Sequence, residues 1–165
     1  MLHIHYMCDM KTSKPTETSI AGLVGEVAQG CLLTRTRRIS RVITSIYDEA
    51  LRPYGVNSPQ FSLLVLIAKL NGASRAEIGR ANHQERSTLT RNLAILLKEG
   101  WIDEIVPKGG RSRPIIITEA GCELLTSAGS AWRSAQLKAH QLLGESGVTA
   151  VIAIADRLPV DPPGA

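Results

Sequence analysis

Apolar residues recur at helical spacing over much of the chain and predict a succession of α-helices. The first long helix covers about residues 31–51 and ends at Pro53-Tyr54-Gly55. The next one has Ser58 as its N-cap and Pro59 at the first helical position, and it ends at Asn71-Gly72. The segment 19–30 is small and interrupted by glycine, so it predicts a weak helix.

The following two helices lie close together in the sequence. Ser74 and Glu77 have the spacing of a capping box, in which each side chain bonds the other's free backbone N–H, and they begin a short helix. A short turn leads into a helix over about residues 86–99, which Gly100 ends. Its apolar stripe consists of Leu89, Leu93, Leu96 and Leu97.

The pattern changes after Gly100. Two short apolar segments, "WIDEIVP" and "RSRPIIIT", flank a Gly-Gly turn and predict a β-hairpin, with Pro114 on an edge strand or one paired on one side only. Thr118 then caps a long helix to about Leu143, which Gly144 or Gly147 breaks before a last helix over 148–158. The candidate packing positions of the long helix are Leu124, Leu125, Ala128, Trp132, Ala135 and Leu137.

This order of elements predicts a mainly α fold that contains a winged helix-turn-helix. We expect a flexible N-terminal arm at 1–18, helical regions at 19–56 and 119–158, a winged helix-turn-helix DNA-binding region at 57–118, and a C-terminal tail at 159–165. The helices outside 57–118 carry more apolar surface than one winged helix can cover, so we expect them to form a dimerisation domain.

The composition agrees with a helical domain, and the positive charge is concentrated in the middle of the chain. The 165 residues are 44% hydrophobic but only 4% aromatic, which favours an aliphatic core. The net charge is +4, yet residues 31–113 carry 14 basic and 7 acidic side chains, and the two ends together are net negative. No apolar run reaches the ~18–20 residues of a membrane span, and the N-terminus lacks the layout of a signal peptide. Cys8, Cys31 and Cys122 cannot all pair, so we expect a cytoplasmic protein.

The helix over 86–99 and the hairpin carry the candidate chemistry. With its leucines facing inward, helical geometry turns Ser87, Thr90 and Arg91 outward, and Arg86 and Thr88 lie in the first turn. Arginine can bind guanine through two hydrogen bonds, and a narrow basic hairpin can enter a minor groove. The predicted DNA-binding residues are Arg86, Ser87, Thr88, Thr90, Arg91, Lys108, Arg111 and Arg113.

Residues 31–158 resemble the MarR family of winged helix-turn-helix regulators. The likeness is carried by "SPQFSLLVLIA", "ERSTLTRNLAILLKEGWI" and "GGRSRPIIITEAG". It implies a homodimer with intertwined terminal helices, and it matches Ser87, Thr88 and Arg91 to base- and phosphate-facing positions and Arg111 to the wing-tip arginine. Two positions depart from the family pattern: Gly109 replaces the usual wing aspartate, and Glu85 replaces the usual Asp cap.

The resemblance implies a regulator, most simply a repressor, that binds a near-palindromic operator and is released by a small aromatic or lipophilic effector. One alternative is a thiol-based redox sensor that uses Cys31, although we favour a buried core role for this cysteine. Another is a winged helix that binds only proteins. We expect no enzyme, because no catalytic triad, metal-ligand spacing or phosphate-binding glycine loop is present. We also expect no cofactor and no metal.

Two further groups have weaker assignments. The arginines of the first long helix are expected to pair between subunits or with solvent and not to contact DNA. They are Arg35, Arg37, Arg38 and Arg41. A metal site in the N-terminal arm is not expected, although the arm contains His3, His5, Cys8 and Asp9.

Overall fold

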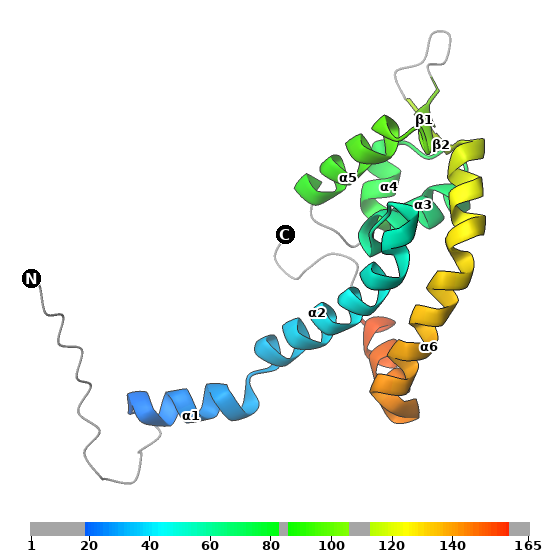
Figure 1. Cartoon of the computed structure of the whole chain (residues 1–165). Helices are drawn as coiled ribbons and strands as arrows, with labels where there is room; N and C mark the ends of the chain where they lie inside the picture. Colours follow the sequence, from blue (N-terminus) through cyan, green and yellow to red (C-terminus); the bar gives the residue numbers. More distant parts are fainter. Residues whose placement is uncertain (1–18, 83–85, 106–112, 159–165) are drawn as a thin grey trace, which may run out of the picture. The chain divides into compact units, whose positions relative to one another are not determined.

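A computed structural model describes residues 19–82, 86–105 and 113–158. The described residues are mostly helical, with one small antiparallel sheet (Figure 1). The chain divides into two compact units, Met1–Ser40 and Arg41–Ala165, and the boundary falls within helix α2 (Leu32–Leu51).

The first unit contains α1 (Ile20–Gly30) and the beginning of α2. Ser19 caps α1 by accepting a hydrogen bond of 3.0 Å from the Gly22 N–H. The sequence predicted a weak helix over 19–30 followed by a long helix from Cys31; the two helices are present, and Cys31, with an extended backbone (φ −65°, ψ 109°), lies between them. No residue of α1 is buried, and its apolar side chains remain exposed. They are Ile20, Leu23, Val24 and Val27, with exposed fractions of 71, 57, 61 and 49%.

In the second unit, α2 ends as predicted. Leu51 is its last residue, the 3-10 helix η1 (Arg52–Tyr54) follows, and Gly55 adopts a left-handed φ of 72°. Helix α3 (Ser58–Leu70) then begins one residue earlier than predicted. Its cap is Asn57, which forms a capping box with Gln60, because the Ser58 N–H is already bonded to Asp48 Oδ1 at 2.7 Å.

Helices α4 (Arg75–Ala81) and α5 (Arg86–Lys98) form the predicted helix-turn-helix. The Ser74–Glu77 capping box is confirmed: the Ser74 N–H and hydroxyl both donate to Glu77 Oε2, at 2.8 and 2.7 Å. Gly100, with φ 72°, ends the segment as predicted.

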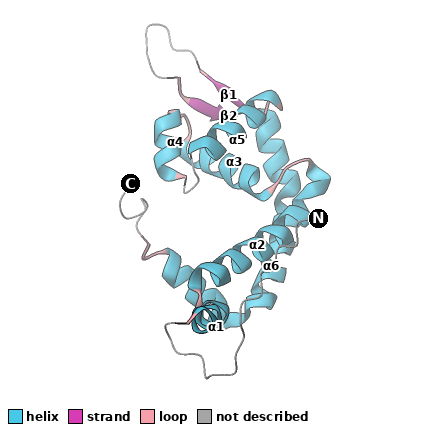
Figure 2. Ribbon diagram, turned by 90° about the vertical axis from the view of Figure 1, so that its left-hand side faces the viewer, coloured by secondary structure: helices cyan, strands magenta, loops and turns pink. Residues whose placement is uncertain are grey.

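The hairpin is also confirmed, with strands β1 (Ile102–Glu104) and β2 (Ile115–Ile117) antiparallel (Figure 2). Ile102 pairs with Ile117, and Glu104 pairs with Ile115. The Ile115 N–H also donates to the Ala73 carbonyl at 2.9 Å, so the connection between α3 and α4 lies along β2.

Helix α6 (Glu119–Ala155) is capped by Thr118 as predicted and is interrupted at Gly144, whose φ of 67° and ψ of 165° are not helical. This interruption is the predicted break before the last helix. Leu124, Ala128 and Ala135 are buried, whereas two other candidate packing positions, Trp132 and Leu137, are not buried within this chain. Both are exposed, because they lie on the side of α6 that no other element of this unit covers.

The core lies between the helix-turn-helix, the hairpin and the start of α6. Its fully buried members come from the end of α2, from α3, α4, α5, β1 and β2, and from α6. The largest are Leu51, Leu63, Leu64, Ile67, Ile78, Leu93, Leu96, Ile102 and Ile115. None of the described helices is long and apolar enough to cross a membrane.

Candidate nucleic-acid interface

Helix α5 has one buried face and one exposed face. Leu89, Leu93 and Leu96 are buried in the core, with at most 6% exposed. The opposite face is open to solvent and carries all the predicted α5 contacts. Its exposed residues are Arg86, Ser87, Thr88, Thr90, Arg91 and Lys98. The leucine spacing therefore predicted the orientation of this helix correctly.

The polar side chains of this face can both donate and accept. The Thr90 hydroxyl donates to the Arg86 carbonyl at 2.8 Å and keeps its oxygen lone pairs for an incoming donor. Arg91 and Lys98 form no ion pair with any residue of the described ranges. Their charges are therefore available to an anionic partner.

One polar residue on the inner face of α5 was not predicted. Asn92 is only 7% exposed, between Leu89 and Leu93. The apolar stripe gave no signal for it, because the pattern counts only apolar residues. A polar residue beside a row of leucines can also be buried when it has a hydrogen-bond partner.

The wing is described only at its base. Arg113 is exposed at the start of the returning chain, whereas Lys108, Gly109 and Arg111 lie outside the described residues, as does Glu85. At the base, Arg75 of α4 forms an ion pair with Glu104 of β1, with Nε and Nη2 at 2.7 and 2.5 Å from Oε1. Together with the Ala73–Ile115 bond, this pair fixes the hairpin to the start of α4.

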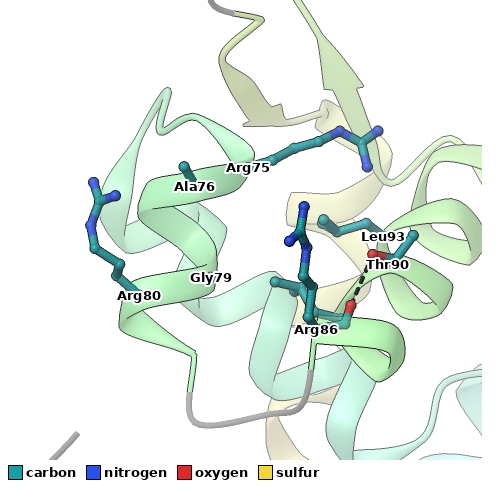
Figure 3. A pocket seen from close by; sticks show the side chains of 8 residues that line it. Arg75, Ala76, Gly79, Arg80, Arg86, Thr90 and Leu93 are labelled. Carbon is teal, nitrogen blue, oxygen red and sulfur yellow. Dashed lines mark hydrogen bonds between the residues drawn. The ribbon is translucent and has the colours of Figure 1, made fainter. Parts of the chain in front are cut away.

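A cleft of about 600 Å³ lies between α4 and α5 (Figure 3). Its floor is formed by the buried Leu89 and Leu93 and the half-buried Gly79. Its rim is exposed and consists of Arg75, Ala76, Arg80, Arg86 and Thr90. In Figure 3 the Arg86 side chain extends up between the two helices, and Arg75 reaches toward the strands.

Arg75 and Arg80 were missed as candidates from the sequence. The available signal was the capping box, because it fixes the phase of α4. With Ile78 buried, the pairs Arg75/Gly79 and Ala76/Arg80 are each four residues apart and border the cleft, and the Arg80 side chain lies on the far side of α4 from Arg86 (Figure 3).

The cysteine of the first unit is not a core residue. Cys31 is partly exposed and lies outside the core, so the favoured interpretation of a buried core cysteine is wrong. Hydrogen bonds to Thr34 lower the pKa of the Cys31 thiol, and the nearby Arg35 charge adds to this shift. Arg35 itself donates a hydrogen bond to the Gln29 carbonyl. The thiol therefore has more thiolate character than an ordinary cysteine.

The remaining arginines of α2, Arg37, Arg38 and Arg41, are exposed, and their role stays a prediction. Among residues 19–82, 86–105 and 113–158, no group of three His, Cys, Asp or Glu side chains could hold a metal ion. His3, His5, Cys8 and Asp9 lie outside these ranges.

Comparison with known proteins gives a consistent result. A family model described as the MarR family matches residues 54–112. The crystal structure of the M. tuberculosis transcriptional regulator MosR is 31% identical, with a TM-score of 0.65, over 78% of this chain and 95% of that one. An E. coli MarR mutant solved with operator DNA has a TM-score of 0.72 at 17% identity, over 81% of this chain and 98% of the MarR chain, and so shows the shared fold.

A curated relative is more distant. The uncharacterised HTH-type transcriptional regulator YwoH of Bacillus subtilis is 25% identical over 88 residues, which is 53% of this chain. The match spans 64% of the length of that relative, slightly under two thirds.

Proposed function

The chain belongs to the MarR family of transcriptional regulators, and from this premise we propose that it binds a near-palindromic operator as a homodimer and represses transcription. Members of the family are non-enzymatic DNA-binding proteins. The observation that carries the proposal is the polar, exposed face of α5 opposite its buried leucines. MosR has been solved in complex with DNA at 31% identity to this chain, which supports the same partner here.

In this proposal, α5 enters the major groove. Arg91 lies on the exposed face, where its guanidinium can bind guanine O6 and N7, and Ser87, Thr88 and Thr90 can bond bases or phosphates. Arg86 neutralises a phosphate near the start of the helix. Lys108, Arg111 and Arg113 of the wing contact the adjacent minor groove or its phosphates.

In this proposal, the dimerisation region at 19–56 and 119–158 binds the second copy of the chain. In the second unit, the apolar side of α6 and the segment after it remain uncovered, with Leu137, Leu142, Ile152, Ile154 and Leu158 each more than half exposed. In the first unit, α1 is uncovered as well. Light scattering at micromolar concentration should give about twice the 17.8 kDa chain mass. A clean monomer would rule out this architecture.

Repression follows if the bound dimer blocks access of polymerase to the promoter, in the cytoplasm where the DNA is. A small aromatic or lipophilic effector relieves it by changing the distance between the two DNA-binding regions. An effector acts only through a difference in affinity between the DNA-bound and free conformations. It should therefore lower operator affinity by the same factor by which DNA lowers effector affinity.

A redox trigger is the second candidate, and the partly exposed Cys31 with its lowered pKa favours it. Thiolates are the oxidisable form of cysteine. Mild peroxide should then release DNA from the parent protein but not from Cys31→Ser. Cys122→Ser, the other described free cysteine, is the matched control and should respond like the parent. Equal responses of all three proteins would remove Cys31 as the trigger.

The proposed function is tested by selecting bound fragments from the genomic DNA of the host. A recovered sequence should be near-palindromic and should bind with a strong, linear dependence of log affinity on log salt. Random duplex should bind more weakly by ~10³-fold or more. If the protein binds no duplex at low salt, the winged helix serves another partner, such as a protein, and the proposal fails.

A further inference from the structure

The two strands of the hairpin are too short to fix its direction by themselves. Strands β1 and β2 have three residues each, and a two-stranded hairpin is at best marginally stable in water. Ile102 of β1 and Ile115 of β2 are buried in the core, but Asp103 is exposed and Glu104 is partly exposed. The direction in which the hairpin leaves the core therefore depends on its attachments to the neighbouring elements.

The two strands are attached in different ways. In β2, the Ile115 N–H donates to the Ala73 carbonyl at 2.9 Å, which is a backbone link to the segment before α4. In β1, Glu104 is the last residue, and its carboxylate is bound by Arg75, the first residue of α4. Within the described part of the chain, this is the ion pair that joins the hairpin to a helix. The direction of β1 relative to the helix-turn-helix therefore depends on two side chains.

The geometry of this pair is suited to holding a direction. Arg75 Nε and Nη2 lie 2.7 and 2.5 Å from the same carboxylate oxygen, Oε1 of Glu104. A guanidinium is planar and presents its donors in a rigid fork, so these two bonds restrict how the carboxylate approaches it. In Figure 3 the Arg75 side chain extends from α4 toward the strands. The two side chains are 48 and 20% exposed, so water screens the pair and it contributes little to global stability.

We propose that Arg75 and Glu104 determine DNA specificity as positioning residues, by holding the wing at a fixed angle to α5. This inference rests on the proposed function. Operator binding requires that α5 and the wing meet their grooves together, whereas binding to random duplex depends on charge and tolerates other wing directions. A surface ion pair shifts an equilibrium by up to about fivefold, so loss of the pair should reduce the share of aligned wings by up to that factor. A homodimer has two wings, which gives up to about 25-fold in operator affinity.

The test compares the affinities of full-length variants for the selected operator and for random duplex. Glu104→Ala should lower the ratio of operator affinity to random-duplex affinity by about 3–25-fold. Asp103→Ala is the matched control, because it removes the same charge from the neighbouring exposed position of β1, which forms no ion pair with any described residue. Its ratio should stay unchanged, since a more positive surface favours both duplexes.

Two further comparisons separate positioning from other roles. A lower folded fraction reduces both affinities equally, so a merely structural loss would not move the ratio. Glu104→Gln keeps an acceptor oxygen without the charge and should lower the ratio less than Glu104→Ala. If Arg75 acts through Glu104, Arg75→Ala should lower the ratio in the parent but not further in a chain that already carries Glu104→Ala.

Two results would overturn the inference while leaving the proposed function intact. One is an equal ratio for Glu104→Ala and Asp103→Ala, because the pair then has no part in specificity. The other is an Arg75→Ala variant that loses affinity equally on both duplexes, with a slope of log affinity against log salt shallower by about 0.9 per site, also in the Glu104→Ala background. Arg75 would then bind a phosphate directly. If the parent itself prefers no duplex, the proposed function has failed first and this inference fails with it.

Discussion

The winged-helix region buries its large apolar residues, whereas α1 leaves its apolar residues exposed. From Leu51 to Ala128, leucines and isoleucines of seven elements meet in one core, and nine of the large ones are fully buried. In α1 no residue is buried, and the far end of α6 likewise carries exposed apolar side chains.

This contrast indicates which part of the chain has a hydrophobic core of its own. A packed core is stabilised by the apolar area that folding removes from water. An apolar face that stays in water gains nothing from folding and marks a surface that another molecule covers. The winged helix can therefore be stable within one chain, whereas the flanking helices leave apolar side chains exposed, and we propose that a second copy covers them.

The largest expected effect is on the core. Leu64→Ala removes a side chain with no exposed area and should lower the free energy of unfolding by ~2–5 kcal/mol. Leu142→Ala is the matched substitution on the uncovered side, where the side chain is 58% exposed. Its effect should appear as weaker dimerisation, measured by denaturation at several protein concentrations. An equal loss from both substitutions at every concentration would contradict the comparison.

The next effect concerns close packing at the start of α6. A Cβ on Gly121 would overlap the carbonyl oxygen of Trp101 and press on Ile117, so Gly121→Ala should lower stability by ~1–3 kcal/mol. Gly25→Ala in α1 is the control, because nothing lies within 4 Å of its Cβ position. That change should be neutral or stabilise α1 by up to ~1 kcal/mol, since alanine is the better helix former. Urea denaturation of both variants decides the matter.

The smallest effect concerns two helix caps. Ser74→Ala should lower the free energy of unfolding by ~1 kcal/mol near neutral pH. Hydrogen bonds from Ser74 lower the pKa of Glu77, so this stabilisation is complete above the usual pKa of a glutamate and is lost as pH falls through the lowered value.

The control for this effect is Ser19→Ala. Ser19 caps α1, but Gly22 occupies the position that Glu77 has in α4, so no carboxylate titrates there. Denaturation between pH 7 and pH 3 should show a Ser74→Ala effect that shrinks toward low pH and a Ser19→Ala effect that does not. Parallel behaviour of the two variants would mean that Glu77 takes no part in the cap.

The elements of the winged helix could be predicted because local signals agree there with tertiary packing. The leucine spacing of α5, the Ser74–Glu77 box and the glycines at 55 and 100 each fix one boundary or one face. The cap of α3 was placed one residue late, because the bond from the Ser58 N–H to Asp48 spans ten residues and has no local signature.

Two kinds of feature could not be predicted: contacts between elements that are distant in the sequence, and the faces of helices that stay uncovered. Nothing local links Arg75 to Glu104, 29 residues away, and so this ion pair was not predicted. Trp132 and Leu137 have the spacing of core residues, but periodicity does not say whether an apolar face meets the same chain or another one.

The central claim is that the exposed face of α5 reads operator bases, and Arg91→Ala tests it most directly. Affinities should be measured on the selected operator and on operators with single base-pair changes. We predict a loss of ~1–3 kcal/mol per half-site and a relaxed preference at one operator position. Lys98→Ala, at the other end of the same face, should change affinity by similar factors on all duplexes. An Arg91→Ala variant with an unchanged affinity profile would contradict the account.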